Sequence, residues 1–272
     1  MKLGLSVWAM PGTWDIETKF AKAKEAGFEG VEVALERNGA INLSTTKEEL
    51  LEIKALAKKH GVELYSVACG LGFECPVGHP DDEKRAEAVE IVKKQLFAAE
   101  VLGCDTILVV PANVNQGMDY EEVYKKAVSS LRELAPIAEQ HGVVIAVENV
   151  WNKFLMSPLE MRNFIDEVGS PYVQAYFDVG NVLNFGFPDN WIEILNSRIR
   201  KVHVKDFLVE QGNMSGFSVR LLEGNVNFSL AMSALRKVGY DSWITAETPF
   251  DMAEPEKSNE YTLNAMKKII KM

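Results

Sequence analysis

The chain repeats one local pattern at regular intervals: a helical segment ends in glycine, and a strand rich in β-branched residues follows. The first four of these glycines are roughly 40 residues apart, and no sequence repeat accompanies the spacing. Glycine ends a helix at low cost because it accepts left-handed backbone. Each interval accommodates one strand, one helix and two loops, so the pattern predicts successive β–α units rather than a solenoid. The six glycines are Gly27, Gly61, Gly103, Gly142, Gly169 and Gly239.

Eight strands and eight helices fit this pattern. The predicted strands cover residues 2–8, 30–35, 62–68, 106–110, 143–148, 173–178, 200–205 and 243–247. The predicted helices cover residues 14–26, 46–60, 81–102, 119–141, 157–168, 226–238 and 256–271, with a short sixth helix near 189–196. Strands separated by helices pair in parallel through right-handed crossovers. The prediction is therefore an α/β fold, a single (β/α)8 TIM barrel over residues 1–272. A doubly wound open sheet is the alternative, but no GxGxxG or Walker motif follows any strand.

Four titratable residues stand at or near the ends of the last four predicted strands. Glu148 ends VVIAVE, Asp178 ends AYFD, His203 lies in KVHVKD and Glu247 lies in ITAET. Any one of them alone is more often a helix cap, a surface ion pair or a hydrogen-bonded core histidine. Four in succession favour a shared site, because the carboxyl ends of barrel strands meet at one mouth. Three carboxylates and one imidazole suit Mn²⁺, Co²⁺ or Mg²⁺, with Zn²⁺ also compatible.

Several longer segments then resemble a known family. VENVWNKFLMSP, FDVGN, KVHVKDF, LLEGNVNF and TAETPF look like segments of the xylose isomerase-like TIM-barrel superfamily, and the resemblance covers nearly the whole chain. They are most similar to sugar-phosphate isomerases and epimerases, including ketose 3-epimerases and putative hexulose-6-phosphate isomerases. The resemblance implies that Glu148, Asp178, His203 and Glu247 bind one divalent metal ion. It also implies that Glu148 and Glu247 act as an acid/base pair on opposite faces of a sugar.

The implied chemistry has two possible outcomes. One glutamate removes the hydrogen next to the ketose carbonyl, and the metal stabilises the enediolate that develops. Return of a proton to the same carbon inverts it, which is epimerisation; return to the neighbouring carbon gives aldose–ketose isomerisation. The residues supply the parts for both reactions, and 3-epimerisation is favoured from the resemblance.

Five further residues are candidates for substrate binding: Trp8, Asn149, Asn181, Lys205 and Arg220. Trp8 ends the first predicted strand and could stack on a sugar face, although core packing fits it equally well. Asn181 stands where free-sugar 3-epimerases of the family have histidine, so it resembles the sugar-phosphate members; a helix cap is the other explanation. Lys205 and His203 are two residues apart on one predicted strand, so their side chains point to the same side. Arg220 lies on the long loop 206–225, and Lys205 and Arg220 are the first candidates to bind a substrate phosphate.

Composition and net charge narrow the alternative functions of the chain. The formal net charge of −10 disfavours a nucleic-acid partner, which needs a basic face. The alternative of an enzyme like endonuclease IV also requires a His-rich three-zinc site, whereas two of the four histidines, His60 and His141, precede helix-ending glycines. A non-catalytic sugar-binding barrel is the third hypothesis. No run approaches the ~20 apolar residues of a membrane span.

Three cysteines without a CxxC motif predict a reducing, cytoplasmic location. Dimers and tetramers occur among similar epimerases, so the resemblance allows a homo-oligomer.

Overall fold

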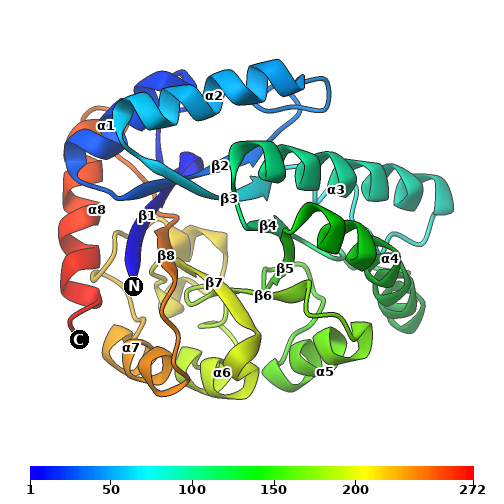
Figure 1. Ribbon diagram of the computed structural model, residues 1–272. Helices are drawn as coiled ribbons and strands as arrows, with labels where there is room; N and C mark the ends of the chain where they lie inside the picture. Colours follow the sequence, from blue (N-terminus) through cyan, green and yellow to red (C-terminus); the bar gives the residue numbers. More distant parts are fainter.

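Every strand pairs in parallel with its neighbours in sequence, and β8 pairs with β1 to close the barrel. The structure is a computed structural model that describes residues 1–272, and Figure 1 shows the helices around the ring of strands. The strands are β1 (Lys2–Ser6), β2 (Gly30–Leu35), β3 (Glu63–Cys69), β4 (Thr106–Val109), β5 (Val144–Glu148), β6 (Val173–Asp178), β7 (Ile199–Val204) and β8 (Trp243–Ala246). The predicted TIM barrel is confirmed, and the open-sheet alternative is wrong because no strand edge is left unpaired.

Each strand is followed by a helix on the outside of the barrel. The helices are α1 (Ile16–Ala26), α2 (Lys47–His60), α3 (Asp82–Leu102), α4 (Tyr120–His141), α5 (Pro158–Val168), α6 (Pro188–Leu195), α7 (Phe228–Lys237) and α8 (Pro255–Ile269). Five of the predicted glycines cap α1 to α5 in the left-handed region, for example Gly61 at φ 68°. The short sixth helix is present. No helix is long and apolar enough to cross a membrane.

The first strand is shorter than predicted. It ends at Ser6, and residues Val7–Ala9 form a 3-10 turn in which the Ser6 hydroxyl accepts a hydrogen bond from the backbone of Trp8. Trp8 therefore lies just beyond β1 rather than at its end. The turn moves the indole out of the strand and onto the carboxyl-end face of the barrel.

The barrel interior is unusually polar. Near the amino ends of the strands, Tyr65 stacks on Trp243 with ring centroids 3.9 Å apart and hydrogen-bonds Thr245. A Cβ atom at Gly4 would lie 2.0 Å from the Tyr65 hydroxyl, so glycine is required there. Toward the carboxyl ends of the strands, Glu32 of β2 is fully buried. Barrel interiors are usually filled by branched aliphatic residues, so these buried polar groups depart from the usual packing.

Candidate metal centre

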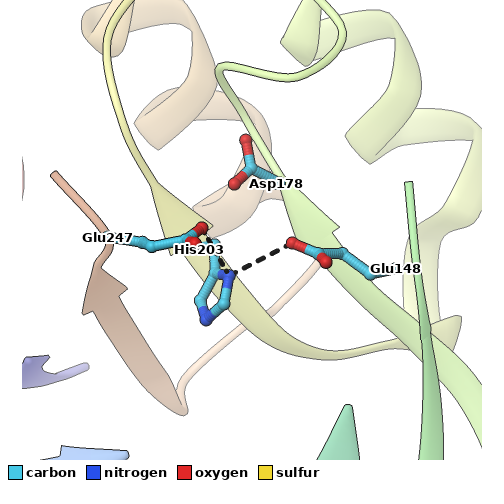
Figure 2. A group of neighbouring side chains, drawn as sticks. All are labelled: Glu148, Asp178, His203 and Glu247. Carbon is cyan, nitrogen blue, oxygen red and sulfur yellow. Dashed lines mark hydrogen bonds and ion pairs between the residues drawn. The ribbon is translucent and has the colours of Figure 1, made fainter. Parts of the chain in front are cut away.

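Four side chains from consecutive β–α units converge at the carboxyl-end mouth of the barrel. Glu148 ends β5, Asp178 ends β6, His203 is the penultimate residue of β7, and Glu247 directly follows β8. Each offers one ligand atom, and the four atoms lie within 4.8 Å of one another. Figure 2 shows the side chains turned toward one another. The predicted convergence is confirmed.

A buried carboxylate fixes the imidazole of His203. Nε2 of His203 lies 2.8 Å from Glu32 Oε1, and Nδ1 lies 3.2 Å from Glu148 Oε1. The hydroxyls of Ser66 and Tyr176 both donate to the other oxygen of Glu32. An ionised carboxylate only accepts hydrogen bonds, so Glu32 accepts a hydrogen bond from the N–H at Nε2. With the proton on Nε2, the lone pair of Nδ1 points toward the cluster.

Two asparagines hold Asp178 in position. The side-chain amide of Asn149 donates to the backbone oxygen of Asp178 and accepts from its backbone nitrogen, at 2.8 and 2.9 Å. Asp178 Oδ1 accepts hydrogen bonds from the backbone of Gly180 and Asn181, both at 2.8 Å. Oδ2 is buried and has no hydrogen bond. Because buried polar atoms are rarely left unsatisfied, this free oxygen fits a metal ligand.

Lys205 sets the charge balance of the cluster. Its Nζ lies 2.7 Å from Glu247 Oε2 and 3.2 Å from Asp178 Oδ2. The first contact is a hydrogen bond, whereas the second is an ion pair without hydrogen-bond alignment, so Asp178 Oδ2 remains unsatisfied. With His203 neutral, the form in which an imidazole binds a metal, three carboxylates and one ammonium leave two negative charges in the site, and a divalent cation would neutralise them. Uncompensated buried charge is costly, so the donor set fits a divalent ion.

The carboxylates experience different electrostatic environments in the metal-free chain. Burial raises the pKa of Glu148 to about 7, against the opposing effect of His203. Burial also raises the pKa of Asp178. Burial would raise the pKa of Glu247 as well, but Lys205 and His203 together hold it below its usual range. The chain itself therefore supplies charge compensation to Glu247 and leaves Glu148 and Asp178 poorly compensated.

A cavity of about 540 Å³ opens over the cluster. This volume is typical of a site for a small organic ligand. The metal cluster contributes Glu148 and Glu247 to its walls. The remaining walls are largely apolar; they are formed by Trp8, Cys69, Gly70, Phe73, Leu108, Val110, Val150, Trp151, Asn181, Lys205, Met214, Phe217, Thr248 and Pro249. Met214 and Phe217 come from the long loop 206–225 after β7.

The sequence matches the family described as xylose isomerase-like TIM barrel over residues 20–269. The chain belongs to this family. L-ribulose-5-phosphate 3-epimerase UlaE of Salmonella paratyphi A is 25% identical over 279 residues, which cover 98% of this chain and 95% of that protein. The putative L-ribulose-5-phosphate 3-epimerase SgbU of Haemophilus influenzae is 26% identical over 246 residues, 88% of this chain and 85% of that protein.

Solved structures show the same fold. D-psicose 3-epimerase of Clostridium cellulolyticum H10, solved with D-tagatose, superposes with a TM-score of 0.83 over 99% of both chains at 18% identity. An L-ribulose 3-epimerase gives a TM-score of 0.83 at 15% identity, over 99% of this chain and 94% of that one. The homology of this xylose isomerase-like barrel to ketose 3-epimerases is therefore distant.

The predicted substrate residues of this xylose isomerase-like barrel are not all brought to the cavity. Trp8, Asn181 and Lys205 line it. Asn149 does not, and its amide is engaged with the backbone of Asp178. Arg220 is exposed on its loop, with its guanidinium 5.3 Å from the ring centre of Tyr261 in α8, and it lines no part of the cavity.

The remaining histidines lie outside the cluster. His60 and His141 are the last residues of α2 and α4, where each contacts a surface glutamate, Glu17 or Glu100. His79 accepts a hydrogen bond from a backbone nitrogen in the loop before α3. The cluster thus has a single imidazole, unlike the His-rich site that an enzyme like endonuclease IV would require.

Sequence reasoning missed Glu32 and its two hydroxyl partners. The signal was present: Glu32 is the only charged residue in the strand GVEVAL, every residue of which is buried. A carboxylate on a fully buried strand needs a partner. In this family member the partner is His203.

Metal loading is expected to stabilise the protein. About one divalent ion per chain should be found by elemental analysis and be removable by a chelator. Free Mn²⁺ at a hundredfold its Kd should add about 2.7 kcal/mol to the free energy of unfolding and raise the thermal midpoint by roughly 5 °C. Asp178→Asn should lose this shift. Asp105→Asn, which alters an ion pair with Lys201 away from the cluster, should keep it. A shift that survives in Asp178→Asn would contradict the assigned ligands.

Proposed function

We propose that the protein is a divalent-metal-dependent isomerase or epimerase of a ketose sugar or sugar phosphate, with epimerisation at C3 as the favoured reaction. The observation that carries this proposal is the buried set of three carboxylates and one imidazole beneath a ligand-sized cavity. The distant relatives are named for 3-epimerisation, which favours that reaction over aldose–ketose isomerisation.

The two glutamates are suited to opposite faces of one substrate carbon. Figure 2 places Glu148 and Glu247 on opposite sides of His203, and both line the cavity. A bound divalent ion would withdraw electron density from the ketose carbonyl and so acidify the neighbouring C–H bond. One glutamate enters the cycle ionised and takes the C3 proton, while the other enters protonated and returns a proton to the opposite face. The configuration at C3 inverts, and the reverse reaction exchanges the two roles.

Other residues of the cavity support binding rather than proton transfer. The ammonium of Lys205, beside Glu247, can donate to a substrate oxygen close to the reacting carbon. The partly buried indole of Trp8 offers an apolar face to the carbon–hydrogen side of a sugar. Asn149 and Asn181 act through Asp178, which their hydrogen bonds hold at the cluster.

Hydrogen exchange tests the proposal directly. The Mn²⁺-loaded protein is incubated in D₂O with a panel of free ketoses and their terminal phosphates, and each sugar is followed by NMR. At least one ketose should lose its C3 proton signal and give the C3 epimer with deuterium at that carbon. Deuterium at C1 with formation of an aldose would instead assign aldose–ketose isomerisation. Binding without exchange for every sugar would leave the non-catalytic sugar-binding barrel as the remaining hypothesis.

A further inference from the structure

The cavity over the candidate metal cluster has no unpaired side-chain cation for a phosphate group. Lys205 is the only cationic residue of its walls, and its ammonium is already shared by Glu247 and Asp178. The other charged residues of the walls are the carboxylates Glu148 and Glu247. Arg220, the other predicted phosphate ligand, lies against Tyr261 outside the cavity. A phosphate dianion here would find no side-chain cation other than the already paired Lys205.

Three neutral side-chain donors of this cavity are engaged as well. The indole nitrogen of Trp151 donates to the backbone oxygen of Asn181 at 2.7 Å, and the amide of Asn181 donates to the backbone oxygen of Asn149 at 2.9 Å. The indole nitrogen of Trp8 donates to Glu36 Oε1 at 2.9 Å. Because a buried anion needs several hydrogen bonds as well as a charge partner, the cavity favours a substrate without a phosphate.

A second cavity of about 640 Å³ adjoins the first on the same face of the barrel. It lies over the carboxyl ends of β1 and β2, and its walls come from β2, the start of α1 and the loops after β1, β2 and β8. Trp8 lines both cavities, so the two cavities meet at this residue. Glu36, bonded to that indole, lies next to Gly70 of the first cavity. Each cavity alone has the size of a ligand site, and together they exceed the need of a single small sugar.

The second cavity has the chemistry of a carbohydrate subsite. Two indoles, Trp8 and Trp14, provide flat apolar surfaces, and Glu36 and Asn38 provide oxygen atoms that accept hydrogen bonds from hydroxyl groups. Phe250 adds a third aromatic ring.

The charges of the second cavity favour a neutral occupant. Asp15 and Glu36 oppose an anion, while Lys19 opposes a cation. The ammonium of Lys19 is already bonded to the backbone oxygen of Val7 at 3.2 Å, and burial lowers its pKa, so it is a poor phosphate ligand. A neutral group rich in hydroxyls fits these walls better than a charged one.

We propose that the second cavity binds an uncharged sugar unit and that the substrate is a ketose linked through its non-reacting end to this unit. The reacting carbons then lie over the metal cluster, and the attached sugar passes Trp8 to lie between Trp8 and Trp14. The identity of the reacting part rests on the proposed function; the subsite rests on the second cavity. The substrate class differs from that of the curated relatives, whose names specify a sugar phosphate.

Three probes that share one ketose and differ only at C6 test this proposal. They are D-fructose, D-fructose 6-phosphate and 6-O-α-D-glucosyl-D-fructose, and binding to the Mn²⁺-loaded protein is measured by calorimetry. The glucosyl probe is expected to bind at least about tenfold more tightly than D-fructose. The phosphate is expected to bind no more tightly than D-fructose.

Variants separate the two cavities. Trp14 lines only the second cavity, so Trp14→Ala should remove the tenfold advantage and leave the affinity for D-fructose unchanged. Asn38 is an exposed turn residue, and Asn38→Trp should fill the second cavity with the same result without removing a packed side chain. Phe187→Ala is the matched control, because this aromatic residue is 66% exposed and lines neither cavity.

The outcomes separate this inference from the proposed function. The subsite is overturned if the phosphate probe binds most tightly, or if the glucosyl probe binds wild-type protein no more tightly than D-fructose. It is also overturned if the tighter binding of the glucosyl probe survives both Trp14→Ala and Asn38→Trp. If free ketoses exchange at C3 while the glucosyl probe gains nothing, the proposed function stands and the subsite fails. If the glucosyl advantage depends on Trp14 but no sugar exchanges, the subsite stands and the proposed function fails.

Discussion

Glu148→Gln and Glu247→Gln are each expected to lower the rate of C3 epimerisation by about 10²- to 10⁴-fold. General acid–base catalysis contributes a factor of this size, and an amide can neither take nor return the proton. Each substitution keeps an oxygen atom that can face a cation but removes one negative charge from the cluster. The rate is therefore measured at saturating Mn²⁺, with the metal content of each variant determined in parallel.

His60→Ala is the control for these two variants. His60 ends α2 and contacts Glu17 on the outside of the barrel, so its loss should change the epimerisation rate by less than about twofold. An epimerisation rate above a tenth of the wild-type value in either glutamine variant, with metal bound, would contradict the two-glutamate mechanism. The two variants also test one another, because a cycle that needs both groups stops when either is removed.

The sequence was sufficient to predict the barrel because the signals that end its helices are local. A helix that ends in glycine at Gly61 or Gly103 depends on backbone preferences within a few residues. The convergence of the four candidate ligands was predictable for a related reason: the fold brings the strand ends together whatever the intervening sequence. The end of the first strand was misjudged, since Ser6 accepts a hydrogen bond from the backbone of Trp8 and begins a 3-10 turn.

Features that depend on distant contacts could not be predicted in the same way. Arg220 and Lys205 looked equivalent as phosphate ligands, but a loop gives no rule for side-chain direction, and Arg220 stacks on Tyr261. The second cavity depends on how the loops after β1, β2 and β8 meet around Trp8 and Trp14. No pattern within any one of these loops encodes that meeting.

Glu32→Gln is expected to weaken divalent-metal binding by about 10- to 100-fold, although Glu32 is not one of the four ligands. Carboxylates that accept the second imidazole hydrogen of a ligand histidine typically contribute this much to metal affinity. In the wild type, the hydroxyls of Ser66 and Tyr176 donate to Glu32 Oε2. Glutamine can place its oxygen toward His203 Nε2, but its NH₂ group then faces these two donor hydroxyls. The alternative orientation satisfies the hydroxyls and opposes the hydrogen on Nε2, so either arrangement weakens the hold on the imidazole.

Metal affinity distinguishes this positioning role from a general loss of stability. The Kd for Mn²⁺ is measured by titration into chelator-treated Glu32→Gln and wild-type protein, and unfolding of the metal-free proteins is compared separately. Tyr65→Phe is the matched control, because it removes a buried hydrogen bond with Thr245 in the same barrel interior without touching His203. An unchanged Kd in Glu32→Gln, or an equal loss in Tyr65→Phe, would show that Glu32 does not orient the imidazole. A loss confined to Glu32→Gln would mean that the metal site extends through the barrel interior from β7 to β2, because the candidate ligand on β7 depends on a carboxylate from a strand that does not adjoin it.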